Sequence, residues 1–319
     1  MPLGFAKSTF THKAAASGSS SYGAYRQTNA LSTGNLAGWS AENLNFNADN
    51  DVSVVFWFRA LNADNDGDSD DWIDGASGSG SGSHFFQVPH SSGIASGNLR
   101  FQYTGQDFGW NLQVRQDRNA VIDGRGLGNT ATQAADSFDG SWKCCMIGFK
   151  ADFDFVGNQS NNNTTGNASE RNFQAVYVND TDYTNMPNGH TRGIWNGSNY
   201  TNGHLGYYNG SFTTTMTLAQ NIGPGFHIGP LWVYNSFINF NTQSERRKYY
   251  DPANTDGFIT PTDTGTTTAG ATQPNLYFYW DGSTLNNGGS DSITLTKRTV
   301  GTGGGFTDIT DGPGSGGTI

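Results

Sequence analysis

Residues 224–252 constrain the fold more than any other stretch, because a strand pattern there is followed at once by a helix pattern. Residues 226–234 are dense in the aromatic and β-branched side chains that suit a pleated sheet. Thr242 and Glu245 have the spacing of a capping box, and three cations follow toward the C-terminal end, where a helix dipole favours positive charge. Because Pro252 disfavours helical geometry at the residue before it, we expect one short helix near residues 242–250.

The composition predicts that the rest of the chain is β-structure. Glycine occurs 44 times and aromatic residues make up 13% of the 319 residues, whereas charged residues make up only 14%. Short aromatic runs separated by Gly, Asn, Ser and Thr are typical of strands joined by polar loops, and a disordered chain would lack the aromatic residues. Strands are expected at residues 51–61, 84–88, 99–103, 110–115, 142–149, 172–179, 226–234, 276–280, 292–298 and 306–309.

These strands favour one large all-β domain, a two-sheet antiparallel jelly-roll sandwich of the concanavalin A-like kind. We expect an extended N-terminal arm over residues 1–42, the sandwich over residues 43–310 and a Gly-rich tail over residues 311–319. Residues 51–61 alternate apolar side chains on both faces, as expected for a strand covered on both sides. The adjacent pair Cys144 and Cys145 is expected to line the core as two free thiols.

Charge and hydropathy exclude several partners. The net charge of −10 argues against a nucleic-acid-binding surface. No apolar run approaches the length needed to span a bilayer, so we expect no membrane insertion. The first 21 residues lack a continuous apolar region, which predicts that they are not a secretory signal peptide.

The order of several motifs resembles a known group of proteins. The motifs are SVVFWFR, SWKCCMIGFK, QAVYVNDT, IGPLWVYNSFINFNTQSERRKYYDP, LYFYWDG and a closing GTGGGFTDIT. In this order they resemble the laminin-G-like, concanavalin-A-like jelly rolls of bacteriophage virion proteins. The segment around Pro274, Tyr277 and Phe278 matches a P-x-x-Y-F pattern common in that group.

The resemblance implies a non-enzymatic structural protein on the exterior of a bacteriophage particle, made in the host cytoplasm. It would serve as a tail-associated adhesion protein or as a head decoration. Its partners would be other virion proteins, bound through the N-terminal arm, and further copies of itself in a homo-oligomer. A host-surface glycan is a further expected ligand. The same superfold hosts lectins and hydrolases, so the residues must decide between these functions.

An acidic stretch at residues 62–74 suggests a calcium site. Asn62, Asp64, Asp66 and Asp70, with Gly67 at the sixth position, have the spacing of the first part of a calcium loop. The candidate ligands in this stretch are Asn62, Asp64, Asp66, Asp68, Asp70 and Asp74. The twelfth position of such a loop is Ile73 instead of glutamate, so calcium would need a ligand from elsewhere, such as Asp71 or Asp74. A solvated acidic loop without metal is the alternative, although close carboxylates repel one another without a cation.

An aromatic loop at residues 190–212 is the second candidate. The flat side chains that could contact a sugar or protein are Trp195, Tyr200, His204, Tyr207 and Tyr208. The alternative is that these rings anchor a long loop onto the sandwich. With the acidic stretch, this loop supports a second hypothesis, a free calcium-dependent carbohydrate-binding lectin.

A polysaccharide hydrolase is the third hypothesis, and the sequence favours it least. Such an enzyme needs two carboxylates facing one substrate. The chain has three glutamates, none in the spacing typical of this superfold, and we assign no catalytic residue. Only Asp152 and Asp154, which would share one face of an extended KADFDFV segment, could form such a pair.

Overall fold

The structure is a computed structural model of the chain, which describes the strands, the segment 226–300 and their immediate connections. The described residues are 24–27, 36–43, 51–60, 84–89, 97–103, 110–116, 119–125, 140–149, 174–182, 215–220, 226–300, 306–309 and 311–316. The statements below concern these residues.

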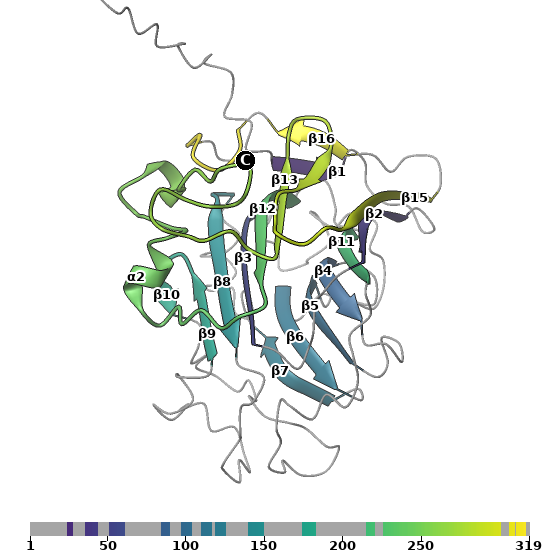
Figure 1. The fold of residues 1–319 in the computed structure, drawn as a ribbon, viewed down its shortest axis with the longest axis horizontal. Coiled ribbons are helices and arrows are strands. Elements are labelled where there is room, and N and C mark those ends of the chain that lie inside the picture. Colours follow the sequence, from purple (N-terminus) through teal and green to yellow (C-terminus); the bar gives the residue numbers. More distant parts are fainter. Residues whose placement is uncertain are drawn as a thin grey trace, which may run out of the picture.

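The described strands form two antiparallel sheets (Figure 1). The nine-stranded sheet has the order β10-β9-β8-β3-β12-β1-β16, and β13 and β14 continue from β12. Its strands are β1 (Ala24–Gln27), β3 (Val52–Ala60), β8 (Lys143–Phe149), β9 (Gln174–Val178), β10 (Thr181–Asp182), β12 (Phe226–Tyr234), β13 (Leu276–Trp280), β14 (Leu285–Asn287) and β16 (Phe306–Ile309). The seven-stranded sheet has the order β15-β2-β11-β4-β5-β6-β7. Its strands are β2 (Leu36–Glu42), β4 (His84–Pro89), β5 (Gly97–Tyr103), β6 (Trp110–Gln116), β7 (Asn119–Arg125), β11 (Thr215–Gln220) and β15 (Thr294–Val300).

The expected fold class, an all-β two-sheet sandwich with very little helix, is confirmed. Each of the ten expected strands overlaps an observed one, and β12 has the expected bounds. Aromatic side chains join the two sheets across the interface. Phe56 of the nine-stranded sheet meets Phe86 of the seven-stranded sheet edge to face, with ring centroids 6.2 Å apart. Trp280 meets Trp39 in the same way at 6.4 Å.

The N-terminal boundary of the sandwich differs from the sequence-based one. β1 and β2 lie within residues 1–42, which we expected to be an arm, yet each belongs to one of the two sheets. β2 lies between β11 and β15, and its last residue is Glu42. Their pattern was missed because LAGWSAE is rich in small residues and AYRQ is only four residues long. The sandwich therefore begins at or before Ala24.

Both faces of the nine-stranded sheet are buried, as the pattern of residues 51–61 predicts. Pairing places Val178, Cys145, Phe56, Leu231 and Phe278 in one cross-strand row on the face toward the seven-stranded sheet. The opposite row contains Tyr177, Met146, Val55, Trp232 and Tyr277. Both rows are buried. The second row needs a covering layer of its own, because the seven-stranded sheet lies on the other side.

The segment between β12 and β13 supplies that layer. It leaves β12, forms the short helix α2 (Gln243–Arg246) and a 3-10 turn (Thr255–Gly257), and returns to β13. Phe240, Tyr249 and Phe258 from this segment join the second row in one apolar cluster. Tyr249 contacts Trp232 edge to face, with ring centroids 5.9 Å apart. α2 lies beside β10 at the edge of the sheet (Figure 1).

The helix is shorter than expected, and the expected capping box is wrong. α2 spans four residues and continues through turns to Tyr250, and the Thr242 side chain makes no capping hydrogen bond. The Glu245 carboxylate accepts hydrogen bonds from Lys248 Nζ at 2.9 and 2.8 Å instead of turning back to the helix start. A single helical turn has only a small dipole. All three cations bind side-chain carboxylates: Lys248 binds Glu245, and Arg246 and Arg247 bind Asp180.

Candidate functional site

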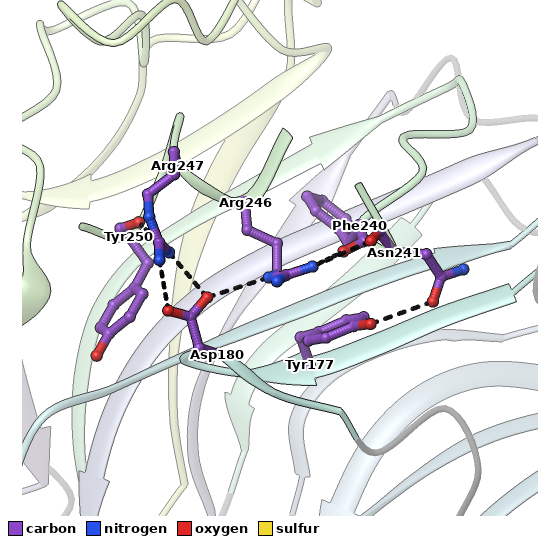
Figure 2. A network of polar contacts seen from close by, with 7 residues as sticks. All are labelled: Tyr177, Asp180, Phe240, Asn241, Arg246, Arg247 and Tyr250. Carbon is purple, nitrogen blue, oxygen red and sulfur yellow. Dashed lines mark hydrogen bonds and ion pairs between the residues drawn. The ribbon is translucent and has the colours of Figure 1, made fainter. Parts of the chain in front are cut away.

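A network of polar contacts joins α2 to the turn between β9 and β10 (Figure 2). We call its three charged members, Asp180, Arg246 and Arg247, the Asp180 fork. Arg247 donates from Nη1 to Asp180 Oδ1 at 2.8 Å and from Nη2 to Oδ2 at 2.6 Å. Arg246 donates from Nε to Asp180 Oδ1 at 3.2 Å. One carboxylate therefore holds two guanidinium groups, one of them bidentately.

The electrostatics of the fork follow from this geometry. The hydrogen bonds from Arg247 are the largest cause lowering the pKa of Asp180 below its ordinary value, and contacts with Arg246 lower it further. The same carboxylate raises the pKa of Arg247. The Asp180 side chain is 37% exposed, so solvent screens part of these interactions. A carboxylate held ionised by two cations is a poor general acid, so the fork has the chemistry of a structural clamp.

Arg246 is the buried member of the fork. Its guanidinium lies 4.2 Å from the centroid of the Tyr177 ring, and its Nη1 donates to Phe240 O at 2.6 Å and Asn241 O at 3.3 Å. The Tyr177 hydroxyl forms a 3.3 Å hydrogen bond with Asn241 Oδ1 (Figure 2). The side chain thus satisfies carbonyl groups just before α2 while packing on β9.

A second charged cluster lies where the chain following β16 crosses the nine-stranded sheet. Arg59 of β3 is buried, donates from Nε to His227 Nδ1 at 2.8 Å and pairs from Nη2 with Asp311 Oδ1 at 2.7 Å. Since Nδ1 accepts this bond, the neutral His227 ring carries its proton on Nε2. The Arg59 guanidinium also lies 5.0 Å from the Trp142 ring centroid. This arrangement is suited to holding a carboxylate.

The two cysteines are free and buried, as expected. Pairing places Cys145 in the row toward the seven-stranded sheet and Cys144 in the opposite cluster. Burial raises the pKa of both thiols. A thiol kept protonated in an apolar interior is a poor nucleophile.

The sequence-predicted ligand sites fall outside the described residues. This holds for the calcium candidates Asn62, Asp64, Asp66, Asp68, Asp70 and Asp74, for the aromatic candidates Trp195, Tyr200, His204, Tyr207 and Tyr208, and for the carboxylates Asp152 and Asp154. These assignments stay predictions. Within the described ranges, no three His, Cys, Asp or Glu side chains gather as a metal site would require. No helix among them is long and apolar enough to cross a membrane.

Sequence reasoning missed both charged clusters. The sequence does contain one indication of the cluster around Arg59. Arg59 is a cation at the end of the apolar run VSVVFWF, and a buried cation needs a partner of opposite charge. The partner is 252 residues away and could not be identified by spacing. For the Asp180 fork, the three cations after Glu245 were visible, but their acceptor lies in a different hairpin.

Comparisons with known proteins find only distant structural likenesses. No family model and no curated protein sequence matches this chain. A native heptameric SAP-like pentraxin from Limulus polyphemus aligns over 86% of this chain and 95% of its own, with 10% identity and a TM-score of 0.37. A structure described as a receptor binding domain aligns over 76% of this chain and 51% of its own, with 13% identity and a TM-score of 0.35. At such low scores these likenesses carry no functional argument, and the strand pairing itself establishes the two-sheet antiparallel sandwich.

Proposed function

We propose that this chain is a non-enzymatic structural protein on the exterior of a bacteriophage particle, where it decorates the head or serves adhesion at the tail. The observation that carries the proposal is the spatial arrangement of the motifs that resemble phage jelly rolls. SVVFWFR lies in β3, KCCMIGF is β8, QAVYV is β9, FHIGPLWVY is β12 and LYFYW is β13.

These five strands are scattered over more than 200 residues of sequence, yet they are consecutive neighbours in one sheet, in the order β9-β8-β3-β12-β13. The rest of the fourth motif, which follows β12, belongs to the layer that covers this sheet, and FTDI of the closing motif is β16. The motifs therefore describe one contiguous structural unit, as a genuine resemblance in fold would require.

The positions of β1 and β16, the first and last described strands, support attachment of the chain to a neighbouring virion protein at a single site. β1 and β16 pair antiparallel, with Ala24 opposite Ile309. Ala24 and Ile309 therefore lie side by side at one end of the strand order of the nine-stranded sheet. A neighbouring virion protein that binds there would leave the rest of the sandwich exposed on the particle.

The first experiment tests location. Purified particles of the source phage should contain the chain by mass spectrometry, and immunogold labelling should place it on the outside of head or tail. Absence from purified particles would refute the virion proposal. A variant that lacks residues 1–23 keeps β1 and β2, so it should fold but no longer join particles. Normal incorporation of this variant would refute attachment through the N-terminal segment alone.

The second experiment tests ligand binding. A glycan array with and without a calcium chelator separates a particle protein without glycan affinity from the alternative, a free calcium-dependent lectin. If the aromatic candidates bind sugar, Trp195→Ala and Tyr207→Ala should lose binding, whereas Tyr183→Ala, outside the candidate set, should retain it. No binding in either condition would count against both the lectin and a glycan-binding adhesion role.

A further inference from the structure

The six residues 311–316, which follow β16, form bends and a turn, and we call them the C-terminal clasp. Two side chains of the nine-stranded sheet and its approach hold the first residue of the clasp. Trp142 Nε1 donates to Asp311 O at 2.9 Å, and Arg59 Nη2 pairs with Asp311 Oδ1 at 2.7 Å. The start of the clasp is therefore fixed by one neutral hydrogen bond and one ion pair.

The rest of the clasp is held by packing and by backbone amides. Pro313 lies against Gly229 so closely that an added Cβ there would be 3.1 Å from Pro313 Cγ. Asp256 Oδ2 accepts hydrogen bonds from Gly314 N at 3.0 Å and from Gly316 N at 2.9 Å. These two amide bonds report whether the clasp is closed, because they join it to the segment that covers the sheet.

The ion pair at the start of the clasp shares its cation with a histidine. Arg59 donates from Nε to His227 Nδ1 at 2.8 Å and from Nη2 to Asp311. Arg59 and His227 are 2% and 5% exposed. Because a guanidinium is always charged and only donates, Nδ1 must stay without a proton for this bond to exist. A proton on Nδ1 would remove an acceptor from Arg59 and place a second positive charge beside it.

The described charged groups around His227 would not compensate that charge. β3 contributes Arg59, and the register of β1 places Arg26 opposite His227. The clasp contributes Asp311, which is 39% exposed and already binds Arg59. Asp256, on the covering segment, is bound to the clasp amides. A protonated His227 would therefore share a single carboxylate with Arg59, in a setting where removing charge from water is costly.

We propose that His227, Arg59 and Asp311 form a pH-sensitive latch that opens the C-terminal clasp in acid. Acid acts in the same direction at both acceptors of Arg59. A proton on His227 removes one acceptor and adds a charge, and a proton on Asp311 removes the counter-ion. The closed clasp disfavours charged His227, so the latch holds above the range in which an ordinary histidine titrates, about pH 5–8, and weakens as pH falls through it. This inference does not depend on the virion proposal.

Hydrogen exchange followed by mass spectrometry tests the latch on the full chain. The measurement is the protection of a peptide containing residues 311–316, relative to the unfolded chain at the same pH. In the wild type, protection should fall about tenfold or more between pH 7.5 and pH 5, since a hydrogen bond to a charged group is lost. His227→Gln keeps an acceptor for Arg59 and cannot titrate, so it should stay within about threefold. His84→Gln, which removes a histidine from β4 of the other sheet, is the matched control and should behave as wild type.

Peptides from β8 and β12 separate opening of the clasp from unfolding of the sandwich. They should keep their protection at pH 5, where the clasp has lost its own. Simultaneous loss in all three peptides, undiminished protection of the wild-type clasp at pH 5, or an equal loss in His227→Gln would each overturn the proposal.

A second variant decides the question if His227→Gln fails to fold. Asp311→Asn removes the counter-ion of Arg59 at every pH, so its clasp should already be about tenfold less protected than wild type at pH 7.5. Asp308→Asn, at an exposed carboxylate on β16, is the matched control and should match wild type at that pH. Wild-type protection in Asp311→Asn would show that the ion pair does not hold the clasp, and would refute the latch.

Discussion

Replacement of Arg246 by alanine tests the strongest energetic claim made for the Asp180 fork. The substitution removes the donor to Phe240 O, which lies in a buried environment, and leaves that carbonyl without this partner. An unsatisfied buried acceptor costs about 1–3 kcal/mol. Loss of the contact with the Tyr177 ring, 4.2 Å away, adds about 0.5–1 kcal/mol. The bond to Asp180 adds little, because this carboxylate is partly exposed and keeps Arg247.

We therefore expect Arg246→Ala to lower the free energy of unfolding by about 3 kcal/mol. With an unfolding entropy of about 2 cal/mol/K per residue, this corresponds to a fall in Tm of roughly 4–5 °C. Urea unfolding followed by tryptophan fluorescence measures the first quantity, and calorimetry measures the second. Arg246→Lys should recover only part of the loss, because an ammonium group cannot reach the separate acceptors in the planar fork geometry.

Arg247→Ala is the matched control, because Arg247 is more exposed and binds the same carboxylate. It should cost about 1 kcal/mol or less. If both alanine variants lose equal stability, the burial argument is wrong. If Arg246→Ala stays within about 0.5 kcal/mol of wild type, the Phe240 carbonyl must find another partner at little cost.

Three further predictions follow from the same structure and sequence. Gly148→Ala should destabilise the chain by about 1–3 kcal/mol in urea titrations, because an added Cβ would collide with Ile238 O. Wild-type stability of this variant would show that the segment covering the sheet shifts freely. Folding lowers the pKa of Asp180, so this residue contributes to the free energy of unfolding above its unfolded pKa of 3.8, and the contribution is lost as pH falls through the lower folded pKa. The difference in stability between wild type and Asp180→Asn should therefore shrink over that pH range. A constant difference would contradict the ion pairs. Calcium at 100 times its Kd should stabilise the chain by about 2.7 kcal/mol if the acidic stretch binds it, and Asp66→Asn should abolish the shift; an identical shift in that variant would exclude this site.

The sequence predicted the elements whose pattern is local. β12 could be placed residue by residue because its aromatic and β-branched side chains are continuous and end at the polar residues Asn235 and Ser236. β2 could not, because its sheet position depends on pairing with β11 and β15, which are far away in sequence. The helix lies where the sequence predicts it, but its side-chain contacts differ from the predicted ones. Glu245 binds Lys248, and Arg246 donates to Phe240 O and packs on the Tyr177 ring.

The two charged clusters show the same limit for sites. Arg59 could be recognised as an anomalous cation, but Asp311 becomes its partner only through the path of the chain after β16. Asp180 lies in the turn between β9 and β10. Nothing in the NDTD sequence indicates that this turn lies beside α2, because that proximity is created by the covering segment.

Burial of the nine-stranded sheet on both faces changes how strand alignment can be enforced. In a sheet with one solvent-exposed face, a one-residue slip in register moves apolar side chains into water and is strongly destabilising. β3 gains no such protection, because a slipped strand would still bury apolar residues on both sides. Ser53 offers a substitute: fully buried, it donates to Ser236 O at 2.8 Å and accepts from Ile238 N at 2.7 Å. A slip of one residue would leave these groups unpaired in an apolar environment. The Ser53 hydroxyl group therefore helps to fix the pairing register of β3.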